Sequence, residues 1–298
     1  MELVLTLIGS VTASGLPITW VEQAADRLGA AGARVGQPGW LSEDEACDLP
    51  FDGIAKDDAA ARLNDFQRET PADCFIQAAA GRRKALLVAD MESTIIGQEM
   101  IDELADTIGL RERISAITAK AMAGELAFED ALRSRVGLLA GLPAAVLDEI
   151  AGRITLNPGA RTLVRTMRRN GAYTALVSGG FTCFTALVRE ACGFHEDQAN
   201  QLVIEGGHLS GAVAEPVLGR GAKLTALKRL AAAKEVPPAA VCAVGDGAND
   251  ADMLAAAGLG VAYRGKAPAR AAASALIDHG DLTALLYLQG YRRSEFAD

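Results

Sequence analysis

The sequence predicts an α/β fold in which a doubly wound parallel sheet carries a helical cap and follows a small N-terminal α/β module. From residue 83 onward, apolar runs alternate with helical stretches, which is typical of a parallel sheet. A purely helical segment interrupts this alternation after the first strand, and the first 82 residues follow a different pattern. We therefore divide the chain into residues 1–82 and 83–298, with the cap at about 98–155.

The expected strands of the parallel sheet are short apolar runs without regular polar alternation. Strands that are covered by helices on both faces have this character. The runs occupy residues 85–89, 172–177, 239–244 and 259–263. Helices are expected at 158–170, which has proline at its start and Gly171 just after its end, and at 222–233. A hairpin with glycine at its turn is expected at 202–209.

The predicted cap contains four successive helical stretches and no strand pattern. They cover residues 98–109, 111–122, 127–140 and 143–154. The third carries apolar side chains at helical spacing, which indicates one buried face. Inserted directly after the first strand, this segment would stand over the strand ends as a lid.

The N-terminal module shows one apolar strand at residues 3–8 and helices at about 20–30 and 59–66. Turn-rich acidic sequence separates the two helices, and residues 70–81 are expected to be a linker. No group of residues typical of a catalytic site occurs here. A regulatory role and a purely stabilising role both remain open for this module.

Composition excludes several functional classes. The chain has 38 acidic and 29 basic residues, a formal net charge of −9, which argues against a nucleic-acid binder. Five cysteines without a C-x-x-C pair fit neither a disulfide framework nor a zinc site. No run reaches the ~18 apolar residues of a membrane helix. We expect a soluble, cytoplasmic protein that binds a small molecule, with no nucleic-acid or membrane partner, and the sequence is compatible with a homodimer.

Polar residues gather where the predicted strands end and where one helix begins. They are Asp90, Glu92, Ser178, Gly179, Lys223, Asp246, Asn249 and Asp250. Ligands of parallel sheets bind beyond these strand ends. Several carboxylates in one place require a cation, and hard oxygen ligands together with phosphate oxygens suit Mg²⁺. Singly, each residue has an ordinary explanation as a turn residue or surface lysine, but their joint placement favours a phosphate site.

At these residues the sequence resembles the haloacid dehalogenase-like phosphatases, and among them the members that act on O-phosphoserine. The resemblance covers roughly residues 83–290. It rests on the strings Asp90-Met91-Glu92-Ser93-Thr94, Val177-Ser178-Gly179-Gly180-Phe181 and Val244-Gly245-Asp246-Gly247-Ala248-Asn249-Asp250, together with Lys223. The helical segment also resembles that family's four-helix cap at Gln98-Glu99, Ala121-Met122, Phe128 and Ser134-Arg135-Val136.

The resemblance implies Mg²⁺-dependent hydrolysis of O-phosphoserine to serine and phosphate, the last step of serine biosynthesis, through a phosphoaspartyl intermediate. Asp90 would attack phosphorus, and Glu92 would serve as general acid and then general base. The family pattern assigns Mg²⁺ to Asp90, the backbone carbonyl of Glu92, Asp246 and, in support, Asp250. It assigns the phosphoryl group to Ser178, Gly179, Lys223 and Asn249. The family usually has Asp where this chain has Glu92, so we expect function to persist with an altered proton-transfer geometry.

The cap supplies the candidates for the rest of the substrate. Arg135 lies on the apolar stripe of its helix, and a guanidinium on a buried face needs an anion. That anion is either the substrate carboxylate or a cap residue such as Glu129, Asp130 or Glu103. Glu99 would bind the ammonium group or simply suit a helix N-terminus. Met122 and Phe128 would seal the site or belong to the core.

Other functions remain open at this stage. The same chemistry could act on another small phosphomonoester or transfer phosphate to an acceptor alcohol. A non-catalytic protein that binds amino-acid phosphates and has lost turnover through the change at Glu92 is a third possibility.

Overall fold

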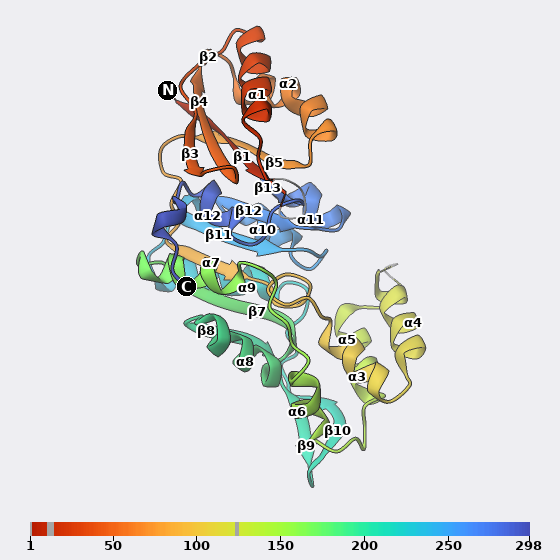
Figure 1. Ribbon diagram of the computed structural model, residues 1–298. Helices are drawn as coiled ribbons and strands as arrows, with labels where there is room; N and C mark the ends of the chain where they lie inside the picture. The colour runs from red at the N-terminus through yellow and green to blue at the C-terminus, as the bar shows by residue number, and fades with distance from the viewer. Residues whose placement is uncertain (1, 11–14, 123–124) are drawn as a thin grey trace.

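A computed structural model describes residues 2–10, 15–122 and 125–298, except for the side chains of 119–122 (Figure 1). Its centre is a six-stranded parallel sheet with the strand order β13-β12-β11-β6-β7-β8, which confirms the predicted fold class. The strands are β6 (Leu86–Ala89), β7 (Tyr173–Phe181), β8 (Glu196–Asn200), β11 (Val241–Gly245), β12 (Leu259–Tyr263) and β13 (Ala275–Ile277). The four expected strands are β6, β7, β11 and β12, and the two edge strands β8 and β13 were not expected.

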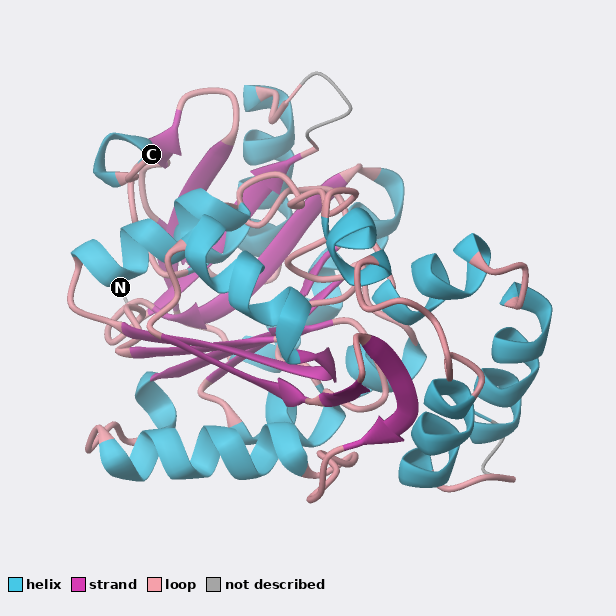
Figure 2. Cartoon of the chain, turned by 90° about the horizontal axis from the view of Figure 1, so that it is seen from below, coloured by secondary structure: helices cyan, strands magenta, loops and turns pink. Residues whose placement is uncertain are grey.

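Helices cover both faces of this sheet (Figure 2). They are α7 (Ala160–Arg169), α8 (Thr182–Cys192), α9 (Ala222–Ala233), α10 (Ala251–Ala256), α11 (Ala267–Ala272) and α12 (Ala284–Leu288). Successive residues of β6 enter different cores, because side chains alternate along a strand. Leu87 packs with residues of α7, α8 and α12, whereas Leu86 and Val88 pack with residues of α9 and α10.

The cap consists of four helices between β6 and α7, as predicted (Figure 1). They are α3 (Met100–Thr107), α4 (Arg111–Met122), α5 (Phe128–Gly137) and α6 (Val146–Ala151). The predicted hairpin is also present, formed by β9 (Leu202–Glu205) and β10 (His208–Val213). The backbone N–H of Gly141 donates to the carbonyl of Leu209 at 2.8 Å, so the hairpin is bonded to the segment that follows α5.

The N-terminal module is an antiparallel sheet with two helices. Its strands are β1 (Leu3–Gly9), β2 (Arg34–Val35), β3 (Gly39–Ser42), β4 (Ala46–Asp52) and β5 (Ala72–Ala78), and its helices are α1 (Ile18–Ala30) and α2 (Lys56–Glu69). The prediction of a linker at residues 70–81 is wrong, because β5 pairs with β1 along its length. Polar residues such as Asp73 and Gln77 interrupt the apolar pattern of this strand, so its sequence predicted a loop.

The module packs against the C-terminal part of the chain. Asp73 of β5 is buried, and its carboxylate accepts backbone N–H groups of Asp278, His279 and Gly280 at 2.7 to 3.3 Å. Ile8 of β1 belongs to the same apolar cluster as residues of α12. In the described part of the chain, no helix combines the length and apolar character needed to cross a membrane.

Candidate active site

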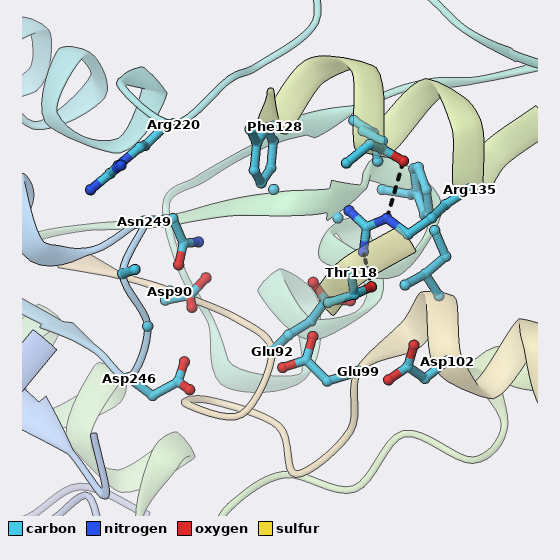
Figure 3. Close-up of a pocket in the computed structure, with 18 of the residues that line it drawn as sticks. Asp90, Glu92, Glu99, Asp102, Thr118, Phe128, Arg135, Arg220, Asp246 and Asn249 are labelled. Atoms are coloured by element: carbon cyan, nitrogen blue, oxygen red, sulfur yellow. Dashed lines mark hydrogen bonds between the residues drawn. The ribbon is translucent and has the colours of Figure 1, made fainter. Parts of the chain in front are cut away.

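Three adjacent strands of the sheet bring the predicted site residues together. Asp90 directly follows β6, Asp246 directly follows β11, and Ser178 lies within β7. Since β11, β6 and β7 are neighbours and parallel, these positions meet at the side of the sheet where the strands have their carboxyl ends. Figure 3 shows the side chains of Asp90, Asp246 and Asn249 close to one another. Oxygens of Asp90, Asp246 and Asp250 all lie within 4.8 Å of one another, and the three residues are buried.

Lys223 lies between two of these carboxylates. Its Nζ is 2.6 Å from Oδ1 of Asp90 and 2.5 Å from Oδ1 of Asp250. Burial alone would lower the pKa of Lys223, but the two carboxylates raise it overall. The lysine therefore stays protonated and neutralises one of the negative charges.

Asp250 is held by the protein on both oxygens. Oδ1 accepts a hydrogen bond from Nζ of Lys223. Oδ2 accepts hydrogen bonds from the backbone N–H groups of Asp246 and Gly247 at 3.1 and 2.9 Å. A Cβ atom on Gly245 would lie 2.3 Å from Cγ of Asp250, so only glycine fits at the end of β11. Asp250 thus orients the loop that carries Asp246.

The donor set suits a hard divalent cation. The buried Lys223 and the half-exposed Lys266 supply two positive charges against three buried carboxylates, and all the ligand atoms that these carboxylates offer are oxygens. Burial and the charge of Asp250 raise the pKa of Asp90, although Lys223 opposes this. A bound cation would favour the ionised carboxylates instead. The residues therefore fit a metal such as Mg²⁺.

The segment Ser178-Gly179-Gly180 forms a compact wall beside Asp90. The backbone N–H of Gly180 donates to Oγ of Ser178 at 2.9 Å, and Nδ2 of Asn200 donates to the carbonyl of Gly179 at 2.9 Å. Gly179 and Asn249 line the cavity, whereas the buried Ser178 lies behind its surface. The peptide at Gly179 is thereby fixed next to Asp90.

Glu92 points into the same cavity, between the core and the cap (Figure 3). Its Oε1 accepts the backbone N–H of Met100, the first residue of α3, at 2.8 Å. Burial, followed by the negative charge of Glu99, raises the pKa of Glu92 to about 7. A carboxyl group with such a pKa can give up and take back a proton near neutral pH.

The cavity has a volume of about 560 Å³ and is enclosed partly by the cap. Phe128, at the start of α5, lies over Gly179, since a Cβ atom on this glycine would be 3.2 Å from Cζ of the ring. Glu99 lines the cavity, and its Oε1 accepts the hydroxyl of Ser93 at 2.7 Å. The side chain of Met122 lies outside the described residues.

Arg135 faces the cavity from α5, and its hydrogen bonds among the described residues go to neutral groups, while the carboxylates of Glu92, Asp102 and Glu99 act on its charge from farther away. Its Nε donates to the carbonyl of Ala131 at 3.3 Å and its Nη1 to Oγ1 of Thr118 at 3.5 Å (Figure 3). No ion pair joins Arg135 to Glu129, Asp130 or Glu103, all of which are described; Asp130 pairs with Arg133, and Glu103 with Arg153. Among the described residues, none of these three acids therefore forms an ion pair with Arg135, and the guanidinium keeps hydrogen-bond donors for an anion in the cavity.

Four polar residues of the cavity wall were not predicted: Asp102, Thr118, Arg220 and Lys266. Asp102 follows Glu99 by three positions, so helical spacing could have placed it on the same face. Lys266 follows β12, and its Nζ is 2.9 Å from Oδ2 of Asp246. A single lysine in a loop gives no sequence signal for such a contact.

Comparison with known proteins agrees with this geometry. Residues 87–255 match the haloacid dehalogenase-like hydrolase family. A phosphoserine phosphatase of Streptomyces coelicolor is 45% identical over 225 residues, which cover 75% of this chain and 55% of that protein. The chain therefore spans little more than half the length of this relative.

Two solved structures are also similar. A haloacid dehalogenase family hydrolase from Salmonella enterica serovar Typhi has a TM-score of 0.84 at 26% identity, covering 97% of this chain and 98% of its own. A phosphoaspartyl-intermediate analogue of phosphoserine phosphatase has a TM-score of 0.64 at 36% identity, covering 69% of this chain and 98% of its own. The first similarity includes the N-terminal module, and the second is confined to a part of the chain.

Proposed function

We propose that this chain, which belongs to the haloacid dehalogenase-like hydrolases, hydrolyses O-phosphoserine to serine and phosphate in the presence of Mg²⁺. One observation carries the proposal. A buried carboxylate cluster lies beneath a cap that presents an arginine without an ion-pair partner among the described residues. We assign the reaction to residues 83–298, with the cap at about 98–155.

Asp90 is the proposed nucleophile. Its Oδ1 is occupied by Lys223 and by the backbone N–H of Met91 at 2.8 Å, and among the described residues no hydrogen bond reaches Oδ2. A carboxylate oxygen of Asp90 attacks phosphorus, and the bond from phosphorus to the serine oxygen breaks. Water then attacks the phosphoaspartyl group, which releases phosphate and restores the carboxylate.

Glu92 is the proposed general acid and base. In the first step it gives its proton to the leaving serine oxygen, and in the second it removes a proton from the attacking water. Such proton transfer contributes about 10²–10⁴-fold to a rate. The pKa of about 7 supports both roles, because each protonation state is accessible near neutral pH.

The remaining core residues bind the cation and the phosphoryl group. Asp90, Asp246 and the backbone carbonyl of Glu92 would hold Mg²⁺, with Asp250 in support. When bound, the metal supplies positive charge that offsets the charge of the transferring phosphoryl group. The backbone N–H of Gly179 and the amide of Asn249, which line the cavity, would orient the phosphoryl oxygens, and the buried Lys223 and the hydroxyl of Ser178 would complete this set from behind the cavity surface.

The cap supports phosphoserine as the substrate. A substrate with one carboxylate and one ammonium group needs one partner of each sign beyond the phosphate. Arg135 and Glu99 are the proposed partners of the carboxylate and the ammonium group, because both line the cavity and come from the cap. Phe128, lying over Gly179, would exclude water, and Met122 is proposed for the same wall. The phosphoserine phosphatases that the chain resembles agree with this choice.

Phosphate release from a panel of amino-acid and sugar phosphates, with Mg²⁺, Mn²⁺ or EDTA, tests the proposal. We expect O-phosphoserine to give the highest kcat/KM and EDTA to abolish release. Preference for a sugar phosphate would contradict the assigned substrate, and no release from any compound would contradict enzymatic function. Formation of phosphohomoserine in the presence of homoserine would indicate a phosphotransferase instead.

A further inference from the structure

Lys266 contacts the metal-binding cluster but has no role in the mechanism above. Its Nζ lies 2.9 Å from Oδ2 of Asp246, and its backbone N–H donates to the backbone carbonyl of Asp246 at 2.8 Å. The side chain of Asp246 is 8% exposed, whereas that of Lys266 is 53% exposed. The backbone and the side chain of Lys266 therefore both contact Asp246, and they do so from the solvent side.

The loop that carries Lys266 is tightly constrained. Arg264 has a φ of +47°, which is uncommon for a residue other than glycine, and its N–H donates to the carbonyl of Ile277 at 2.8 Å. A Cβ atom on Gly265 would lie 2.9 Å from Cβ of Ala262. This turn between β12 and α11 fixes the backbone of Lys266 next to Asp246.

Lys266 differs from Lys223, the other lysine of the cluster. Lys223 is buried and bridges Asp90 and Asp250, so both of its carboxylate partners hold it inside the site. The half-exposed Lys266 has a flexible four-carbon chain and can leave Asp246 without losing hydration. Among the described residues, Lys266 is the cation on an aspartate of this cluster that solvent can reach.

We propose that Lys266 competes with the divalent cation for the carboxylate of Asp246 and so weakens the affinity of the site for metal. This inference rests on the proposed metal site. A cation that approaches Asp246 must displace the ammonium from Oδ2 and then share the site with its positive charge. Repulsion between charges a few ångströms apart is substantial at a partly buried site. Lys266 thus lowers the affinity for the metal by occupying Oδ2 of Asp246 and by repelling the cation.

Calorimetric titration of the metal-free protein with Mg²⁺, without substrate, tests this inference independently of turnover. The variant Lys266→Met removes the charge but keeps most of the apolar chain, and it should lower the Kd for Mg²⁺ about tenfold. Lys266→Arg should bind Mg²⁺ like the wild type. Lys228→Met is the matched control, because it removes an exposed lysine of α9 and should leave the Kd unchanged. Thermal unfolding of each variant checks that it is folded.

The outcomes separate this inference from the proposed function. An unchanged or higher Kd in Lys266→Met, with normal binding by the wild type, would contradict competition and leave the metal site intact. A lower Kd in Lys228→Met as well would show a general effect of net charge and would also overturn the inference. Failure of the wild type to bind Mg²⁺ would overturn the metal site itself, and the competition with it.

Discussion

The carboxylate of Glu92 lies directly against Gly180. A Cβ atom on this glycine would be 2.9 Å from Oε2 and 3.1 Å from Cδ of Glu92. Glu92 is one methylene longer than the aspartate usual in the family, and the bare Cα of Gly180 provides the space that this longer side chain uses. The side chain of Glu92 and the backbone of Gly180 are therefore packed closely against each other.

Replacing Gly180 with Ala should reduce kcat for O-phosphoserine about 10- to 100-fold, because the added methyl group displaces the Glu92 carboxylate. The backbone of Gly180 has no positive φ, so alanine is compatible with the local conformation. The measurement is steady-state phosphate release, with thermal unfolding as the check on folding.

The double variant Glu92→Asp with Gly180→Ala provides the control. The shorter aspartate should tolerate the methyl group, so Gly180→Ala should cost less activity in the Glu92→Asp background than in the wild type. Equal losses in both backgrounds would mean that the methyl group acts elsewhere in the site.

The pH dependence of phosphoenzyme formation should report on Glu92. In the proposed mechanism Glu92 acts first as an acid, so the rate should fall as pH rises through its pKa. The negative charge of Glu99 raises that pKa, so the variant Glu99→Gln should ionise Glu92 at lower pH. The kcat/KM for O-phosphoserine follows ionisation in the free enzyme, where no substrate ammonium offsets Glu99, and its falling limb should therefore be shifted to lower pH in Glu99→Gln. If the rate of Glu99→Gln fell at the same pH as that of the wild type, ionisation of Glu92 would not be the cause of the fall.

Replacing Arg135 with Ala should raise KM for O-phosphoserine about 10- to 100-fold, the effect of losing a charge-assisted hydrogen bond. KM for p-nitrophenyl phosphate, which lacks the carboxylate, should change much less. Arg133→Ala is the matched control on the same helix, because Arg133 pairs with the surface residue Glu215 at 2.7 Å. Equal increases in KM for both substrates would show that Arg135 has a structural role.

Replacing Asp73 with Ala should reduce the free energy of unfolding by about 2–4 kcal/mol, because backbone N–H groups at 278–280 lose their acceptor in a buried place. Denaturant unfolding measures the change. The control Asp65→Ala removes an exposed aspartate of α2 and should stay within about 0.5 kcal/mol of the wild type. A wild-type stability in Asp73→Ala would indicate that the N-terminal module is only loosely attached.

The parts of the fold that sequence could predict are those in which burial is regular. The runs that became β6, β7, β11 and β12 are apolar apart from Thr174, because helices cover both faces of the sheet. The ends of these runs also predicted the positions of Asp90 and Asp246. Strand β8 begins Glu196-Asp197-Gln198 at the edge of the sheet, where solvent permits polar side chains, so its sequence has no apolar run.

The same limit applied to parts of the site. Asp73 is buried in β5 because residues more than 200 positions away provide its hydrogen-bond donors, and local pattern does not contain that information. Lys266 reaches Asp246 through a turn between β12 and α11. Arg135 was predicted as a buried cation, but only the structure could show that Asp130 and Glu103 pair with other arginines.

The central claim is that Asp90 becomes phosphorylated during turnover. Acid quenching of the protein during hydrolysis of ³²P-labelled O-phosphoserine with Mg²⁺, followed by peptide mapping, tests it most directly. We predict label on the peptide that contains Asp90, its loss on a chase with unlabelled substrate, and neither label nor phosphate release in Asp90→Asn. Phosphate release by Asp90→Asn at the wild-type rate, or turnover of the wild type without label on that peptide, would contradict the account.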